Sequence, residues 1–242
     1  MIDIHSHLLY GLDDGPSKIE DSIRMISAAQ KQGIKVIIST IHFHESFYKF
    51  ERIQEKFLKL ASRALDFDIV LKLGYEVFIN SMSCENFQKL KQFTLDNSKY
   101  LLIEFPFSEF PTFSLESIYL LQSEGIVPII SHPERCRFFV ENYDVLLSFL
   151  ESGCLVQLDI GSIVGVYGRH ARNMAKRLIK SRKVHFVASN AHFADDYTDW
   201  FDKALFKVKK WSGVEYVDAV FNKNAEMITG SSQGNAQINV YK

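Results

Sequence analysis

Histidine and carboxylate side chains that could bind divalent metal ions recur along the chain, and most stand at the ends of short apolar runs. His5 and His7 are two residues apart, so a strand would point both to one face. Glu104 interrupts an apolar run, where an uncompensated carboxylate would be costly. The histidines and carboxylates of this kind are His5, His7, His42, Glu76, Glu104, His132 and His192, and Asn190 adds an amide oxygen. Imidazole and carboxylate ligands suit Zn, Mn or Fe, and the oxygen-rich part favours Mn or Mg.

Each of these residues alone has a simpler explanation. A single histidine at a strand end is usually a hydrogen-bonded structural residue, and we expect that role for His44, His170 and His185. Glu104 could be an ordinary strand carboxylate, paired with Arg135. The joint pattern nevertheless favours a metal centre, because the C-terminal ends of parallel strands meet at one rim, where α/β enzymes assemble their active sites.

The cysteines do not fit a thiol-dependent tyrosine phosphatase. Such an enzyme needs an arginine six residues after its cysteine, so that the thiolate lies in a phosphate cradle. Six residues after Cys84, Cys136 and Cys154 stand Leu90, Asn142 and Ile160. We therefore expect the cysteines to be packing residues. The chain also lacks a glycine-rich nucleotide-binding loop of either standard type.

The composition indicates one globular domain. A chain of 242 residues that is 47% hydrophobic can build one sizeable core. Its net charge of −1 does not suggest a nucleic-acid partner. The start resembles no signal peptide, and no apolar stretch reaches the roughly 20 residues of a membrane span. Three widely spaced cysteines make a disulfide framework unlikely, so a reducing cytoplasm is the expected location.

Apolar, β-branched runs alternate with amphipathic segments, which predicts an α/β barrel of β/α units over residues 1–230 and a polar tail over 231–242. The expected strands are Ile2–His7, Val36–Thr40, Ile69–Val77, Tyr100–Phe105, Val127–Ser131, Leu155–Asp159 and Val184–Ala188. Ser17 and Glu20 predict a capping box at the start of a first helix that ends near Gly33. Further helices are expected at Arg52–Leu65, Ser114–Glu124, Tyr143–Glu151, Ala171–Lys180 and Trp200–Trp211.

Several stretches, taken in order, resemble the polymerase and histidinol phosphatase (PHP) superfamily. The branch they resemble is the manganese-dependent protein-tyrosine phosphatases of bacterial capsule and exopolysaccharide gene clusters, the CpsB/CapC-like family. The matching stretches are Met1-Ile2-Asp3-Ile4-His5-Ser6-His7, Asp13-Asp14-Gly15-Pro16, Ser39-Thr40-Ile41-His42, Gly74-Tyr75-Glu76-Val77, Leu102-Ile103-Glu104-Phe105-Pro106, Ser131-His132-Pro133-Glu134-Arg135 and Ala188-Ser189-Asn190-Ala191-His192. The first stretch and His132-Pro133-Glu134-Arg135 are specific to this branch.

The resemblance implies a distorted TIM-like barrel of seven β/α units around up to three divalent ions. Mn²⁺ is the expected metal, with Fe, Zn or Mg as alternatives. One ion would take His5, His7 and Asn190, a second would take Glu104 and His132 with Glu76 bridging the two, and a third would take Asp14, His42 and His192. Arg135 would hold the phosphate as a bidentate fork, and Asp14 and His42 would be catalytic with it.

The chain departs from the family pattern at four places. The usual Ser-Asp-x-His is Ser189-Asn190-Ala191-His192 here, so a neutral amide replaces a charged ligand. The arginine expected five residues after that histidine is Tyr197. Thr-Pro-His is replaced by Thr40-Ile41-His42, and Asn-Pro by Asn224-Ala225. The first metal site is therefore expected to be short of one negative charge.

The resemblance implies a protein-tyrosine phosphatase that acts on a phosphotyrosine protein, in particular the tail of an autophosphorylating bacterial tyrosine kinase, and regulates capsular or exopolysaccharide synthesis. The aromatic stretch from Phe105 to Phe113 could present an apolar surface to a tyrosine ring, or could simply pack a loop. Two alternatives stay open. One is a small-molecule phosphatase of the histidinol-phosphate type. The other is a degenerate member that binds phosphotyrosine or a kinase without turnover, which Asn190 and Tyr197 keep possible.

Overall fold

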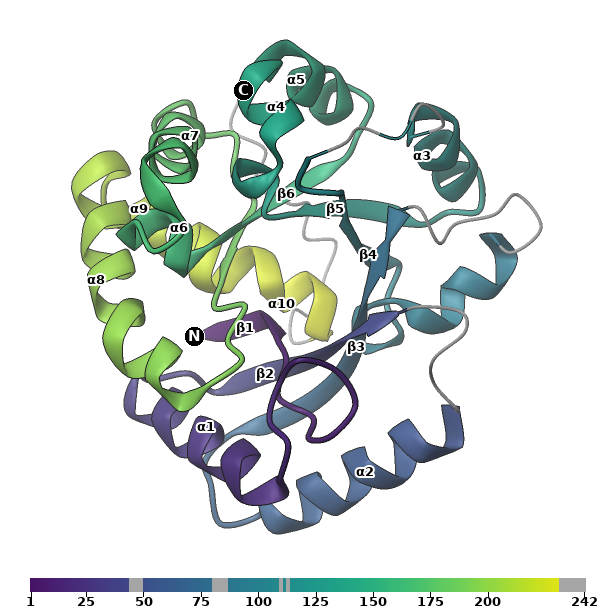
Figure 1. The fold of residues 1–242 in the computed structure, drawn as a ribbon, viewed down its shortest axis with the longest axis vertical. Coiled ribbons are helices and arrows are strands. Elements are labelled where there is room, and N and C mark those ends of the chain that lie inside the picture. Colours follow the sequence, from purple (N-terminus) through teal and green to yellow (C-terminus); the bar gives the residue numbers. More distant parts are fainter. Residues whose placement is uncertain (44–49, 80–86, 109–110, 112–113, 231–242) are drawn as a thin grey trace.

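Seven parallel strands in sequential order form one sheet that curls into a nearly closed barrel in the computed structural model (Figure 1). The structure describes residues 1–43, 50–79, 87–108, 111 and 114–230. The strands are β1 (Ile2–Ser6), β2 (Val36–Phe43), β3 (Val70–Phe78), β4 (Tyr100–Glu104), β5 (Val127–Ser131), β6 (Leu155–Asp159) and β7 (Phe186–Ala188). The predicted distorted barrel of seven β/α units is confirmed.

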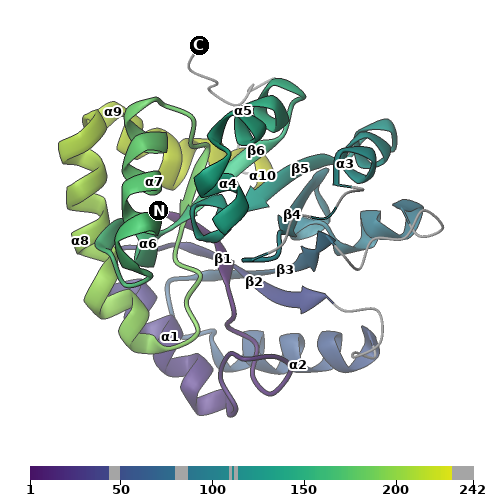
Figure 2. The same cartoon turned by 45° about the horizontal axis from the view of Figure 1, so that its top comes forward.

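The helices surround this barrel, as the tilted view in Figure 2 shows. They are α1 (Ile19–Lys31), α2 (Phe50–Arg63), α3 (Ser114–Ser123), α4 (Arg137–Glu141), α5 (Tyr143–Glu151), α6 (Ile160–Val164), α7 (Gly168–Lys180), α8 (Ala194–Ser212), α9 (Val214–Asp218) and α10 (Asn224–Thr229). Short 3₁₀ segments are η2 (Phe87–Phe93), η3 (Leu95–Asn97) and η4 (Pro133–Arg135), and η5 (Ala219–Lys223) is π-helical. Helix α8 lies against α1, so the helix after the last strand packs on the helix after the first.

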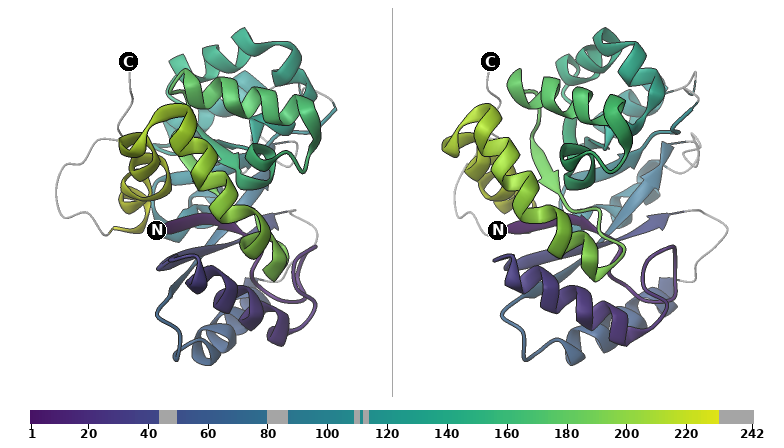
Figure 3. Two further views of the ribbon diagram at one scale, coloured as in Figure 1. Left: turned by 90° about the vertical axis from the view of Figure 1, so that its left-hand side faces the viewer. Right: turned by 60° about the vertical axis from the view of Figure 1, so that its left-hand side comes forward.

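Two apolar clusters hold these layers together. The larger cluster fills the space between the strands and the outer helices. The smaller one lies inside the barrel and includes Tyr100, Leu102 and Ile129, together with Ala225 and Ile228 of α10. Figure 3 shows α10 at the end of the barrel where β1 begins. Helix α10 therefore closes that end with apolar side chains. The C-terminal ends of the strands lie at the opposite end of the barrel.

Strand alternation explains which side chains enter the barrel at that opposite end. In β4, Tyr100 and Leu102 belong to the inner cluster, whereas Leu101 and Ile103 belong to the outer one. Glu104 shares the parity of Tyr100 and Leu102, so it faces the interior at the last position of its strand. The regular periodicity of a strand thus brings a carboxylate to the inner rim.

The first strand and the segment after the last one close the barrel without a regular ladder. Ser6 and Ala191 form an isolated parallel bridge. The backbone N–H of Asn190 donates to the His5 carbonyl at 2.8 Å, and that of His7 donates to the Ala191 carbonyl at 2.9 Å. We call these contacts between residues 5–7 and 189–192 the seam. Predicted metal ligands lie on both sides of it.

Element boundaries differ from the sequence-based predictions in places. Strand β2 continues to Phe43, since its pairing with β3 persists to Phe43 and Val77. The predicted capping box is wrong: α1 begins at Ile19, and its N-cap residue Lys18 makes no side-chain cap hydrogen bond. Gly33 does follow the end of that helix, with a φ of +77° that favours glycine.

Several predictions fall on residues outside the described part of the chain. They concern His44, Cys84, Phe110, Phe113 and the tail at 231–242. Over the part that the structure does describe, none of the helices combines the length and apolar character that a membrane crossing requires.

Candidate metal centre

Glu76 lies at the centre of the histidine cluster at the C-terminal ends of the strands. Its Oε2 atom is 3.2 Å from His5 Nε2, 3.5 Å from His7 Nε2 and 3.3 Å from His42 Nδ1. Its Oε1 atom is 3.0 Å from His132 Nε2. One buried carboxylate thus contacts imidazoles from β1, β2 and the segment after β5, in the position expected of a bridging ligand.

A second group of ligand atoms surrounds Asp14. Its Oδ1 atom is 3.2 Å from His192 Nε2, 3.5 Å from His42 Nε2 and 3.9 Å from His7 Nδ1. The His7 and His192 rings stack at 4.3 Å between centroids, and the His7 and His42 centroids are 4.4 Å apart. The predicted third set, Asp14, His42 and His192, is therefore brought together, with His7 beside it.

Glu104 approaches the cluster from the other side. Its carboxylate oxygens are 3.6 Å from His42 Nδ1 and 4.0 Å from His132 Nε2. Three overlapping groups of potential ligands result, with ligand atoms within 4.8 Å of one another: His7, Asp14, His42 and His192; His5, His7 and Glu76; and His42, Glu76 and Glu104. The overlap matches the expectation of a polynuclear rather than a single-ion site.

The electrostatics of the cluster fit divalent cations. Burial disfavours a charged Glu76, yet His5 and the other imidazoles hold its pKa well below the usual range. Burial likewise opposes protonation of His7 and His132, but Asp13 and Glu76 raise the pKa of His7 to about 10, and Asp159 and Glu76 raise that of His132 to about 9. Without metal, protons on the histidines compensate the negative charge of these carboxylates. Divalent cations could take the place of those protons.

Unsatisfied oxygens give a second, independent sign of the fit. Glu76 Oε2 and Asn190 Oδ1 are buried and accept no hydrogen bond from a described residue. A buried acceptor without a donor is costly unless something else satisfies it. Because both atoms belong to predicted metal ligands, a bound cation is the natural partner for them.

Two residues that sequence reasoning missed orient the first histidines. Asp13 Oδ2 lies 3.0 Å from His7 Nδ1, and Gln157 Oε1 lies 3.1 Å from His5 Nδ1. These bonds turn the Nε2 atoms of both rings toward Glu76, and such outer partners commonly fix metal-binding histidines. Asp13 stands in the same Asp-Asp-Gly-Pro stretch as Asp14, but sequence alone did not distinguish their roles. Gln157 is a polar residue within the apolar run of β6, which was the available signal.

Asn190 has an acidic neighbour that sequence reasoning did not single out. Its Nδ2 atom donates to Asp159 Oδ2 at 3.0 Å. Asp159 is fully buried at the last position of β6. It therefore carries the same signal as the predicted ligands, a polar residue at the end of an apolar strand. The expected shortage of negative charge at position 190 must be reconsidered, because a carboxylate lies within hydrogen-bonding distance.

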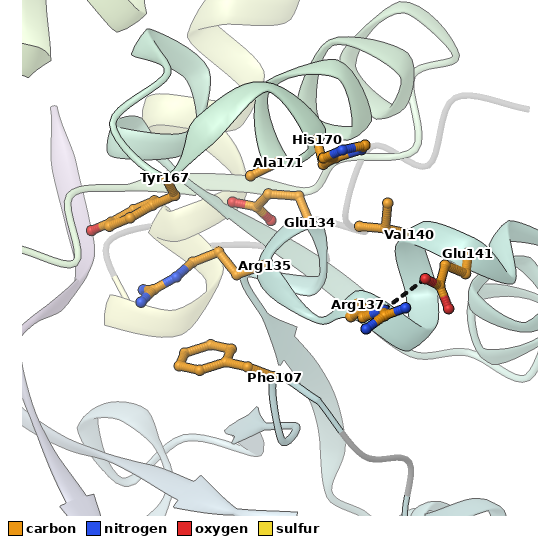
Figure 4. A pocket seen from close by; sticks show the side chains of 9 residues that line it. All are labelled: Phe107, Glu134, Arg135, Arg137, Val140, Glu141, Tyr167, His170 and Ala171. Atoms are coloured by element: carbon orange, nitrogen blue, oxygen red, sulfur yellow. Dashed lines mark hydrogen bonds and ion pairs between the residues drawn. The ribbon is translucent and has the colours of Figure 1, made fainter.

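Arg135 borders the cluster and lines a pocket of about 830 Å³ (Figure 4). Its guanidinium carbon is 4.1 Å from the ring centroid of Tyr167 and 4.7 Å from that of Phe107. Its Nη1 atom donates to Asp159 Oδ2 at 3.0 Å, so its partner is Asp159 rather than Glu104. Figure 4 shows the guanidinium between the two rings, which restricts its orientation. The other pocket residues are Glu134, Arg137, Val140, Glu141, His170 and Ala171.

The aromatic stretch after β4 divides between two roles. Phe107 is 45% exposed and faces Arg135 in the pocket, whereas Phe105 is buried against Phe139 and Phe149. Phe105 therefore packs the loop, whereas the contact of Phe107 with a tyrosine ring stays a prediction.

Among the described residues that were expected to be structural, His185 and two cysteines take that role, whereas no hydrogen bond of the His170 side chain is seen. His185 is buried and its Nδ1 atom accepts a hydrogen bond from the Val156 backbone N–H. Cys136 and Cys154 are buried in the core with free thiols, and burial raises the pKa of Cys154 to about 12. His170 is exposed on α7 and lines the Arg135 pocket, away from the metal ligands.

Comparison with known proteins places this arrangement in a family. Residues 1–229 match the model described as capsular polysaccharide synthesis, CpsB/CapC. The chain belongs to the CpsB/CapC family. The tyrosine-protein phosphatase YwqE of Bacillus subtilis is 36% identical over 94% of this chain and 91% of its own length. The tyrosine-protein phosphatase CpsB of Streptococcus pneumoniae is 30% identical, covering 94% of this chain and 98% of that protein.

Solved structures agree with the assignment to the CpsB/CapC family. A structure described among those of YwqE and CpsB, metal-dependent tyrosine phosphatases, aligns over 100% of both chains with a TM-score of 0.86 and 32% sequence identity. The lactonase Lmo2620 from Listeria monocytogenes aligns over 100% of this chain and 95% of its own with a TM-score of 0.60 and 12% identity, which shows the fold alone.

Tyr197, which stands where the CpsB/CapC-like pattern has an arginine, lies in the core. Its side chain is fully buried, and its hydroxyl donates to Asp3 Oδ2 at 2.8 Å and lies 3.0 Å from Ser6 Oγ. Tyr197 therefore supports β1 just before the histidine pair and does not line the pocket of Arg135. Among the described residues that line this pocket, Arg135 and Arg137 are the arginines.

Proposed function

We propose that this protein is a metal-dependent protein-tyrosine phosphatase that hydrolyses phosphotyrosine and acts in capsular or exopolysaccharide synthesis. The observation that carries the proposal is the position of Arg135. Its guanidinium lies between two aromatic rings and donates to Asp159, which also accepts a hydrogen bond from the predicted ligand Asn190. A phosphate group needs a cation of this kind, and a tyrosine ring needs apolar walls. The relatives named tyrosine-protein phosphatases support the same assignment.

The ligand set supports up to three divalent ions, with Mn²⁺ as the proposed metal. His5, His7, Glu76 and Asn190 would hold one, Glu76, Glu104 and His132 a second, and Asp14, His42 and His192 a third. Such ions would lower the pKa of a water molecule and neutralise the oxygens of a phosphoryl group. Imidazole and carboxylate ligands without thiols suit Mn²⁺, and Fe, Zn or Mg could take the same positions.

The residues of the chain bind and orient the substrate in this proposal. The planar guanidinium of Arg135 would donate two parallel hydrogen bonds to phosphate oxygens, which a lysine could not do. Phe107 and Tyr167 hold that plane by stacking on it, and they could also contact the tyrosine ring. The pocket beyond them would accommodate residues next to the phosphotyrosine in a flexible segment, such as the tail of an autophosphorylating tyrosine kinase.

A chelation experiment tests the mechanism class. EDTA should abolish hydrolysis of an aryl phosphate, and added Mn²⁺ should restore it. Replacing Cys84, Cys136 and Cys154 together by Ala or Ser should leave turnover within a few-fold of the original value. The folded fraction of this variant is checked by circular dichroism, because Cys136 and Cys154 are buried. Activity that survives EDTA and disappears with one cysteine would refute the mechanism.

A substrate comparison tests the rest of the proposal. A tyrosine-phosphorylated peptide should be hydrolysed with a higher kcat/KM than histidinol phosphate, because only the peptide can fill the pocket beside Arg135. Preference for histidinol phosphate would instead identify a small-molecule phosphatase. Tight binding of the peptide without turnover, in protein with a full metal complement, would identify a binding protein.

A further inference from the structure

Asp159 connects the predicted metal ligands with Arg135, the proposed phosphate-binding residue. Its Oδ2 atom accepts hydrogen bonds from both Asn190 Nδ2 and Arg135 Nη1, each at 3.0 Å. Its Oδ1 atom accepts one from Gln157 Nε2 at 2.9 Å, and its backbone N–H donates to Glu134 Oε1 at 3.0 Å. A single buried carboxylate thus contacts a predicted metal ligand, the proposed phosphate-binding residue and the residue that orients His5.

Hydrogen-bond donors surround the carboxylate of Asp159. The Arg135 guanidinium and the Asn190 amide both donate to Oδ2, and the Gln157 amide donates to Oδ1. A charged carboxylate that is fully buried must be compensated by hydrogen bonds or cations, and here it has both. The negative charge that Asn190 does not carry is therefore present one side chain away.

The hydrogen bond to Asp159 also fixes the amide of Asn190. An amide can present either its nitrogen or its oxygen in a given direction, and the acceptor at Asp159 requires the nitrogen on that side. Asn190 Oδ1 then points elsewhere, and it is buried without a hydrogen-bond donor among the described residues. The backbone N–H of Asn190 donates to the His5 carbonyl and its backbone carbonyl contacts the His192 ring, so the residue itself lies between two predicted metal ligands.

We propose that Asp159 is a positioning residue that turns the Asn190 carbonyl oxygen toward the metal centre, supplies the negative charge missing at position 190, and anchors Arg135 for phosphate. The metal part of this proposal does not depend on the proposed function, whereas the Arg135 part rests on it. In this proposal Asp159 and Asn190 together replace one charged ligand. Asp159 on β6 carries the negative charge, and Asn190 after β7 supplies the ligand oxygen.

This inference predicts that restoring an aspartate at position 190 alone does not improve metal binding. Asn190→Asp would place a second buried carboxylate about 3 Å from Asp159 and remove the N–H between them. Two acceptor oxygens would then face each other without a hydrogen between them, so the side chain at position 190 would lose the contact that orients its other oxygen. The exchange Asp159→Asn with Asn190→Asp, in contrast, keeps one charge and one amide donor between the two positions.

A double-mutant cycle tests the metal part. Asp159→Asn, Asn190→Asp and the combined exchange are compared with the original protein for Mn²⁺ retained after dialysis and for Mn²⁺ affinity by calorimetry. Each single change should weaken affinity by about 10–100-fold, the usual effect of losing a supporting group at a metal. The exchange should return affinity to within about 3-fold of the original, so the effects are strongly non-additive.

Two further variants provide an independent test and a control for the metal part of the proposal. Asn190→Ala removes the proposed ligand oxygen and should lower Mn²⁺ affinity as much as is expected for Asp159→Asn. It therefore tests the proposal independently if Asp159→Asn folds poorly. Asp96→Asn removes a carboxylate that pairs with Lys72 away from the centre and should leave metal affinity unchanged. Original affinity in Asp159→Asn or Asn190→Ala, or single effects that simply add in the exchange, would overturn the proposal.

Binding of inorganic phosphate to the Mn²⁺-saturated proteins tests the Arg135 part separately. Asp159→Asn should weaken phosphate binding about 10-fold, because a guanidinium without its buried partner is less well positioned. The exchange should restore metal but not phosphate binding, since residue 159 stays neutral. Full phosphate affinity in Asp159→Asn would refute this part. If no variant hydrolyses phosphotyrosine while the metal cycle behaves as expected, the proposed function fails and the metal part stands.

Discussion

At the scale of single residues, a hydrogen bond at its edge and aromatic rings on its two faces hold the guanidinium of Arg135. Asp159 accepts a hydrogen bond from its edge, and Phe107 and Tyr167 cover its faces. Among the described residues, Asp159 is the only acceptor seen for it, so N–H groups remain for an oxyanion. Its side chain is 21% exposed, which lets a ligand approach while limiting competition from water.

Arg135→Ala should lower kcat/KM for an aryl phosphate by about 10²-fold or more, the usual cost of losing a positioned group that stabilises developing charge. Mn²⁺ content should change little, because Arg135 is not among the ligands. Arg137→Ala is the matched control: Arg137 lines the same pocket, but its ion pair with Glu141 is exposed and worth little. If Arg135→Ala kept the same kcat/KM as Arg137→Ala and the original protein, Arg135 would not bind the substrate.

The sequence identified the candidate ligands because each stands at the end of an apolar strand or in a recognisable stretch. It did not identify Asp13 or Gln157, since their contribution lies in hydrogen bonds whose geometry depends on the whole barrel. Asp159 was visible as the last residue of a predicted strand. Its importance emerges only from its distance to Asn190, which no sequence pattern reports.

At the scale of elements, strand parity and strand pairing determine the inner rim. His42 and Glu76 are direct partners in the register of β2 and β3, so they point to the same side at the same height. The long strands were predictable because apolar β-branched runs are distinctive. The helices α4, α6 and α9 were missed because five residues span barely more than one turn and show no amphipathic period.

His185, which lies just before β7, should make this element sensitive to acid. Burial, with a contribution from Lys183, lowers its pKa from 6.5 to about 4. Between these values the unfolded chain binds a proton that the folded chain does not, so stability is complete above pH 6.5 and falls as the pH decreases toward 4. The loss should be on the order of 3 kcal/mol.

The variant His185→Asn provides the measurement. Its amide oxygen can accept the Val156 N–H in place of Nδ1, but it does not titrate. In urea unfolding between pH 7 and pH 4, the free energy of unfolding of the original protein should fall more steeply than that of the variant. A difference that stays constant across this range would mean that His185 is not the acid-sensitive group.

At the scale of the whole molecule, the seam joins the first strand to the last, and predicted ligands stand on both sides of it. His5 and His7 belong to one side, and Asn190 and His192 to the other. A cation shared by these residues would therefore bind only the closed barrel. Since unfolded protein lacks this arrangement, metal binding should stabilise the entire fold and not merely the site.

Removing metal should consequently lower the melting temperature. Mn²⁺ at about 100 times its Kd contributes about 2.7 kcal/mol, which corresponds to a shift of roughly 5–10 °C for a chain of this size. Calorimetric scans with EDTA and with excess Mn²⁺ give the value. His5→Ala should show a much smaller shift, because it removes a ligand on one side of the seam. Identical melting temperatures with and without Mn²⁺ in the original protein would contradict the linkage.

The seam also sets the order in which the molecule can be assembled. Ser6 and Ala191 are separated by 185 positions, so this contact closes a loop that contains most of the chain, and its entropic cost grows with that length. During synthesis His5 and His7 emerge early, yet the partners that complete their site emerge more than three quarters of the way along the sequence. A nascent or truncated chain without residues 190–192 would lack Asn190 and His192, so the predicted ligand set is complete only after the last strand has been added.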